Sequence, residues 1–286
     1  KMQTDPTLKD RYDLPLSTSS PTAAAFYIEG LDLLISYNHG AEELLQQALD
    51  ADEGFALAHA ALATMHMFRN RVPQAKASIS RARELSRGAT RREQGHVNAV
   101  VAFINGPGPR ALDLIQEHVK DFPRDMLLIR ITNWLYVLGC FGAAVPNFPE
   151  ASLAWMRGLA PSYGEDWAFL GQYAFSFHES GYLHEAFRLA QRSLKLYPRN
   201  SMASHSVSHV FFERGDASSG TDFLAGWLPT FDNRATYHVH LSWHLALFEL
   251  AMGHYQRALE LYDGGIRPSV TAKSPLSLTD SASLMW

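Results

Sequence analysis

Apolar residues recur with a helical period along most of the chain. Between Trp167 and Asn200 apolar or small residues fall three, four and seven residues apart, at Leu170, Tyr173, Ala174, Phe177, Ala186, Ala190 and Ser193. This spacing places them on one face of each of two successive helices. Pro198, which has no N–H to donate, ends the second helix. Because no stretch alternates as a strand does, the pattern predicts an all-α protein of about fourteen helices.

The helix pairs repeat at a regular distance. A glycine that ends one helix is followed five residues later by a small residue, at Gly181 and Ala186, Gly215 and Gly220, and Gly253 and Ala258. The first two glycines are 34 residues apart and the next two are 38 apart. A period of 34 built from helix, turn and helix resembles the tetratricopeptide repeat. The resemblance implies a right-handed α-solenoid in which the first helix of each pair lines a concave surface.

The pattern also divides the chain into three segments. Residues 1–20 are polar and predict an extended N-terminal arm, residues 21–263 a single solenoid, and residues 264–286 a loop followed by the start of a further helix. Asp280 is a candidate N-cap for that last helix. We also expect a linker at residues 159–165, which contain Pro161 and Gly164. Since the chain ends within a helical pattern, we expect the natural protein to continue beyond Trp286.

Two histidine pairs stand out in the last two repeats. His205 and His209 are four residues apart, as are His240 and His244, so each pair shares one face of its helix. The repeat register implies that His178, His205 and His209 point into the concave groove. Neighbouring helices pack roughly 8–10 Å apart. We therefore expect all five histidines to converge in one pocket, with apolar walls from Trp167, Phe175, Tyr237 and Trp243.

Such a cluster has several possible chemistries. One is the binding of a peptide or small polar molecule in the groove, by the same five histidines and four aromatic residues. Another is a metal-dependent enzyme in which His205, His209, His240 and His244 hold a divalent transition metal. A third is metal-free acid–base catalysis, and a fourth is that the histidines only pack against one another. Candidate carboxylates are Asp166, Glu179 and Glu249, none of them within an HExxH motif. The sequence leaves open whether the protein is an enzyme.

The composition and the net charge limit the classes of partner that we expect. Of the 286 residues, 47% are hydrophobic and 19% are charged, and the formal net charge is −4. Without a basic excess we expect no nucleic-acid partner, and we interpret Arg81, Arg83, Arg91 and Arg92 as a solvated helix surface.

We expect no membrane span, because no apolar run approaches the roughly 20 residues required. The lone cysteine, Cys140, excludes an internal disulfide framework and is interpreted as a buried, inert thiol. We expect a cytoplasmic protein, and the sequence leaves oligomerisation open.

Four motifs carry a closer resemblance. They read ASHSVSHV at 203–210, HLSWHLAL at 240–247, YQRALELYD at 255–263 and DSASLMW at 280–286. Together they resemble the tetratricopeptide repeat protein 38 family, over the stretch from Trp167 to the end and more loosely before it. The family often has a glutamate three residues after the histidine matching His209, where this chain has Phe212. The resemblance implies a helical repeat fold and does not imply a particular activity.

Overall fold

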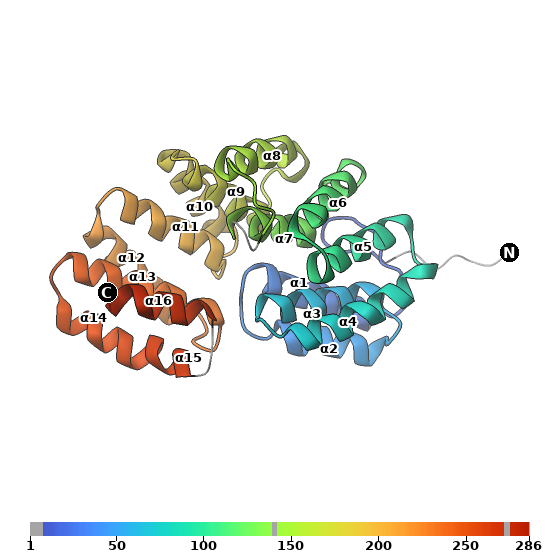
Figure 1. Ribbon diagram of the computed structural model, residues 1–286, viewed down its shortest axis with the longest axis horizontal. Coiled ribbons are helices and arrows are strands. Elements are labelled where there is room, and N and C mark those ends of the chain that lie inside the picture. Colours follow the sequence, from blue (N-terminus) through green and yellow to red (C-terminus); the bar gives the residue numbers. More distant parts are fainter. Residues whose placement is uncertain (1–7, 139–141, 272–274, 286) are drawn as a thin grey trace. The chain divides into compact units, whose positions relative to one another are not determined.

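The computed structural model describes residues 8–138, 142–271 and 275–285 (Figure 1). Cys140, interpreted above as a buried thiol, lies outside the described residues. The chain divides into two compact units: unit 1 takes in Lys1–Ile35 and Gly40–Gly164, and unit 2 takes in Ser36–His39 and Glu165–Trp286. Within the described ranges the secondary structure is helical, apart from an isolated bridge between Lys9 and Pro15. The predicted all-α class is therefore confirmed.

Unit 1 is built from helices that pack in sequential pairs. Their bounds are α1 Pro21–Ile35, α2 Ala41–Ala51, α3 Ala56–Phe68, α4 Val72–Leu85, α5 Arg91–Asn105, α6 Gly108–Asp121, α7 Met126–Val137 and α8 Phe148–Tyr163. The predicted linker at 159–165 is wrong up to Tyr163, because α8 continues through Pro161. The buried ring of Tyr163, 5.9 Å from that of Tyr12, holds this last turn in the core.

Unit 2 continues the pairing. Its helices are α9 Trp167–Glu179, α10 Leu183–Leu196, α11 Ser201–Glu213, α12 Ala217–Trp227, α13 Thr236–Ala251, α14 Tyr255–Leu261, α15 Arg267–Thr271 and α16 Pro275–Met285. Where a loop was expected after residue 263, a π-helical turn at Tyr262–Ile266 leads directly into α15. Ile266 is fully buried against Ala246 and Ala258, and this contact keeps the segment ordered as helix. Among the described helices none is both long and apolar enough to cross a membrane.

The repeat is visible in how the first helix of each pair ends. After α9, α11 and α13 the chain turns at Gly181, Gly215 and Gly253, all with positive φ. At each turn the next N–H reaches back five residues, as Tyr182 N does to Phe177 O at 2.9 Å, with equivalents at Asp216 and His254. This is the Schellman arrangement, in which an αL residue lets the last carbonyls of the helix be satisfied. Asn70 ends α3 in the same way in unit 1.

A buried ionic network occupies the core of unit 1. Asp125, just before α7, accepts hydrogen bonds from Arg92 Nε at 3.0 Å, His96 Nδ1 at 2.9 Å and His118 Nε2 at 3.0 Å. Arg92 also lies 3.7 Å from Asp10 of the N-terminal segment. The interpretation of Arg92 as solvated is therefore wrong, while Arg81, Arg83 and Arg91 are exposed as expected. Arg92 pairs with carboxylates that lie 33 residues later and more than 80 residues earlier, which local charge patterning does not reveal.

Burial by itself would raise the pKa of Asp125. The positive charge of Arg92 and the bonds from His96 and His118 reverse this effect and hold the pKa well below its usual value. Asp125 is thus ionised in the folded protein, and its charge is compensated within unit 1.

Candidate functional site

The histidine cluster is built from three helices of unit 2 that open successive pairs. Asp166 caps the start of α9, where it accepts from Phe169 N at 2.8 Å, and Asn200 caps α11, where it accepts from Met202 N at 3.2 Å. α11 packs against both α9 and α13. α9 contributes His178, α11 contributes His205 and His209, and α13 contributes His240 and His244. The cluster is therefore fixed on helices and not on loops.

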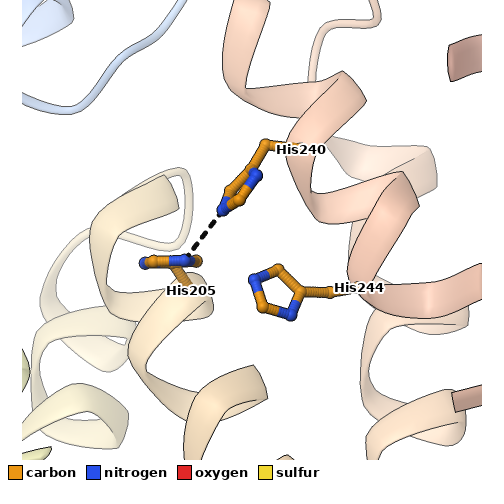
Figure 2. A group of neighbouring side chains, drawn as sticks. All are labelled: His205, His240 and His244. Carbon is orange, nitrogen blue, oxygen red and sulfur yellow. Dashed lines mark hydrogen bonds between the residues drawn. The ribbon is translucent and has the colours of Figure 1, made fainter. Parts of the chain in front are cut away.

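The imidazole rings meet as the helical spacing predicts. His205 Nε2 lies 2.8 Å from His209 Nε2 and 3.0 Å from His240 Nε2. The ring centre of His244 is 5.0 Å from that of His205 and 4.7 Å from that of His209, and His178 lies 4.6 Å from His209. Figure 2 shows His205 on α11 and His240 and His244 on α13, with their rings turned toward one another.

The partners of these rings determine where their protons lie. His240 Nδ1 is 2.9 Å from Asp280 Oδ2, and since an ionised carboxylate only accepts, that nitrogen carries the proton. His240 Nε2 therefore presents a lone pair to His205. His205 Nε2 in turn faces two ring nitrogens at hydrogen-bonding distance but has at most one proton to donate. If the three rings are neutral, only one of the two close N···N contacts can therefore be a hydrogen bond. A metal cation bound between the ring nitrogens would remove this conflict.

Burial keeps His205, His209 and His244 uncharged. Desolvation, followed by the neighbouring histidines, lowers the pKa of His205 and of His244 well below its usual value. Desolvation and the proximity of His178 and His240 lower the pKa of His209 to about 3. Neutral imidazoles keep a lone pair, which is the form that binds metals.

His244 has the least satisfied environment of the five. Its side chain is buried, with the residue 3% exposed, and neither ring nitrogen has a hydrogen-bond partner among the described residues. Leaving a buried polar group unpaired costs about 1–3 kcal/mol. Its ring packs against those of His205, His209, His240 and Trp243. A buried donor and acceptor with no protein partner requires an explanation, and a bound ligand supplies one.

Aromatic residues surround the cluster on several sides. Phe175 stacks on His205 at 5.6 Å, and Trp243 stacks on His240 at 5.2 Å. The hydroxyl of Tyr237 lies 3.2 Å from His205 Nδ1. Trp167 is the exception, because its ring stacks on Tyr197 at the start of α9. Eleven residues of helix place it about 16 Å along the axis from His178.

Of the three carboxylates proposed from the sequence, one belongs to the cluster and two do not. Glu179 is 3.1 Å from His178 Nδ1 and so belongs to the cluster. Asp166 caps α9, and Glu249 accepts from His254 Nδ1 at 2.7 Å. Sequence reasoning missed Asp280, which was interpreted as an N-cap but lies inside α16 and contacts His240. A carboxylate 40 residues away on a helix outside the repeat has no local signal in the sequence.

Within the described part of the chain, two groups place possible metal-ligand atoms within 4.8 Å of one another. One is His205, His240 and His244, and the other is His178, Glu179 and His209. The five histidines are divided between the two groups without overlap.

No protein-family model matches the chain. Among solved structures, a tetratricopeptide repeat protein from Parabacteroides merdae ATCC 43184 aligns with a TM-score of 0.56 at 14% identity, over 93% of this chain and 99% of that one. The chain has a tetratricopeptide-repeat-like fold.

Two further structures align less closely with this TPR-like chain. PilW, a type IV pilus biogenesis factor, gives a TM-score of 0.38 at 14% identity, over 91% of this chain and 99% of that one. Human IFIT1, solved as a dimer with m7Gppp-AAAA, gives 0.49 at 15% identity, over 94% of this chain and 65% of that one. At such identities the likeness concerns the fold alone, so the function has to be argued from the site.

Proposed function

We propose that unit 2 binds a divalent transition-metal ion through His205, His240 and His244. The observation that carries the proposal is the convergence of three imidazoles from two helices, with ligand atoms within 4.8 Å of one another and with those of His205 and His244 buried and uncharged. Nitrogen ligands at 2.0–2.1 Å around a tetrahedral zinc lie about 3.3 Å from one another. The 3.0 Å separation of the Nε2 atoms of His205 and His240 is close to that value.

Residues around the three histidines have the character of an outer ligand shell. Histidines that bind metals usually donate their second N–H to a carboxylate or another oxygen, which fixes the tautomer and the ring orientation. Asp280 does this for His240, and the hydroxyl of Tyr237 is within reach of His205 Nδ1. The two unpaired nitrogens of His244 are accounted for in part if one of them binds the ion.

The donor set limits the metal and its chemistry. Imidazole suits zinc, iron, copper and nickel, whereas magnesium and calcium prefer oxygen. Three histidines leave a coordination position open, which is the arrangement used by catalytic metal sites. A bound ion there would supply Lewis-acid activation of a substrate or water. We therefore extend the proposal to a metal-dependent enzyme, of which a hydrolase is the simplest form.

Binding of a peptide or small polar molecule is the second candidate. It is favoured by the half-buried state of His209, Tyr237, His240 and Trp243, which gives the cluster an edge in contact with solvent. A TPR-like fold also suits an interaction scaffold. In this version the neutral imidazoles donate and accept hydrogen bonds without a metal.

Two further points remain proposals. Membership of the tetratricopeptide repeat protein 38 family is supported by the histidine motifs on α11 and α13 and by the TPR-like fold. A cytoplasmic location is supported by the presence of one cysteine in 286 residues, since disulfide-rich chains are typical of oxidising compartments.

The test is the metal content of tag-free protein measured by mass spectrometry, with thermal unfolding in parallel. We expect at least one equivalent of transition metal in the wild type and one equivalent fewer in the His205→Ala/His244→Ala variant. His184→Ala is the matched control, because His184 is a largely exposed histidine of unit 2. No metal in the wild type, and no stabilisation by added zinc, iron, cobalt or nickel, would contradict the proposal. Peptide and metabolite binding would then be measured with the same variants.

A further inference from the structure

We propose that the cluster is dinuclear, with a second divalent transition-metal ion held by His178, Glu179 and His209. The inference rests on the proposed function, because it adds an ion beside the first. The ligand atoms of these three residues lie within 4.8 Å of one another, and none of them belongs to the first group. From the sequence, His209 was considered as a ligand of the same ion as His205, whereas here it is assigned to a second ion.

The two positions are immediate neighbours. His209 Nε2 lies 2.8 Å from His205 Nε2, and the ring of His209 is 4.7 Å from that of His244. Ions in two-metal sites are about 3.5–4 Å apart, which requires ligands of one ion to touch ligands of the other. The contact between His205 and His209 meets this requirement, since each belongs to a different set.

The second set has ligands suited to a cation. His178 is buried, with a side chain 7% exposed, and Glu179 is the one carboxylate among the six residues of the two sets. Both lie in the last turn of α9, where the negative end of the helix dipole favours positive charge. His209 packs edge-to-face on His178 and reaches the same space from α11.

The alternative is that Glu179 only orients His178, as Asp280 orients His240. Its Oε1 lies 3.1 Å from His178 Nδ1, a distance that suits either role. The two roles of Glu179 predict different numbers of bound metal ions. As an orienting residue Glu179 would tune the affinity for one ion, whereas as a ligand it is needed for a second ion to bind.

The chain provides a matched control for this pair. His184 and Glu185 are also adjacent, also on one helix, and also in contact, with Nδ1 and Oε1 3.4 Å apart. They lie on the outer surface of α10, with side chains 84% and 43% exposed, and are not part of either group. A His184→Ala/Glu185→Gln variant therefore removes the same chemical groups from a place where no site is proposed.

The experiment is a zinc titration of metal-stripped protein, followed by calorimetry and by metal analysis after desalting, with a cobalt titration read by visible absorbance. We expect two equivalents in the wild type and in the His184→Ala/Glu185→Gln control, and one equivalent in His178→Ala and in Glu179→Gln. Glu179→Gln keeps the shape of the side chain, so it protects the test against a folding defect in His178→Ala. Thermal unfolding of each metal-free variant verifies that it is folded.

Each other outcome overturns a distinct claim. One equivalent in the wild type, unchanged by His178→Ala and Glu179→Gln, overturns the second ion and leaves the proposed function standing. Loss of both ions in His178→Ala overturns the division into two sets. Loss of one ion in the His184→Ala/Glu185→Gln control assigns the second equivalent to the surface of α10. No bound metal in the wild type overturns this inference together with the proposed function.

Discussion

Unit 1 and unit 2 each bury a group of histidines, and they satisfy them in opposite ways. In unit 1, His96 and His118 meet the two oxygens of Asp125, which also binds Arg92. In unit 2, His205 contacts other imidazole nitrogens, and His244 forms no side-chain hydrogen bond among the described residues. The first group has a carboxylate for both of its histidines, whereas the second leaves both ring nitrogens of His244 without a hydrogen bond among the described residues. The chemical type of the partner, more than the burial of the histidine, separates the structural network of unit 1 from the proposed binding site of unit 2.

The largest effect is expected in unit 1. Asp125→Ala leaves Arg92 buried without its main counter-charge, and breaking such a pair costs about 3–5 kcal/mol. We expect the free energy of unfolding, measured by urea titration, to fall by that amount. The His205→Ala/His244→Ala variant, compared metal-free, should lose much less. Equal losses of unfolding free energy in the two variants would show that both histidine groups are structural, which would contradict the contrast between the two units.

The same carboxylate makes unit 1 sensitive to acid. The pKa of Asp125 is lower in the folded than in the unfolded protein, so its contribution to stability is complete above about pH 4, the unfolded value. It is lost as the pH falls through the folded pKa. We expect the difference in unfolding free energy between wild type and Asp125→Asn to be largest above pH 4 and to shrink below it. A difference that is constant down to pH 2 would show that the ionised state of Asp125 is not what stabilises unit 1.

In unit 2 the corresponding carboxylate should act on metal affinity. Asp280→Asn keeps the size of the side chain but removes the charge that fixes the tautomer of His240. Loss of such an outer partner costs about 10–100-fold in metal affinity. Competition titration with a chromophoric chelator measures this. The control is Ser283→Ala, which lies on α16 like Asp280 and removes the hydroxyl that accepts from Trp243 Nε1 of α13. It should change the metal affinity by less than about threefold.

The smallest effect on stability is expected at His244, and it tests whether the two units satisfy their histidines differently. Replacement by leucine removes two unpaired buried nitrogens, which cost about 1–3 kcal/mol where they stand. Metal-free His244→Leu should therefore unfold at the same or a higher temperature than metal-free wild type. Added zinc should stabilise the variant less than it stabilises the wild type, because His244→Leu removes a ligand of the first ion only. A metal-free variant that melts several degrees lower would show that His244 is held by the protein itself.

Periodicity predicted the parts of the molecule that are local in sequence. The 34-residue spacing of Gly181 and Gly215 gave the helix pairs, because a positive-φ residue ends each first helix in the same way. The four-residue spacing gave the shared faces of His205 with His209 and of His240 with His244. The histidine pairs depend on a single turn of helix and the helix pairs on a repeated turn, both of which the sequence specifies directly.

Long-range contacts that the repeat register does not relate were not predictable. Asp280 is 40 residues from His240, and Asp125 is 33 residues from Arg92, so neither pairing leaves a periodic trace. The extended α8 and the π-helical turn also escaped sequence reasoning, because burial of Tyr163 and Ile266 outweighs the local effect of proline and glycine. The sequence thus indicated the imidazoles of the candidate site and missed one of its carboxylates.

The position of Asp280 has a consequence for the last helix, α16 (dark red in Figure 1), which packs against α13. If a docked Asp280 tightens metal binding, thermodynamic reciprocity requires the bound metal to tighten docking by the same factor. A tenfold change in affinity thus corresponds to about 1.4 kcal/mol of added docking free energy. Proteolysis within α16, compared with and without zinc, would then read metal occupancy from a helix that carries none of the proposed ligands.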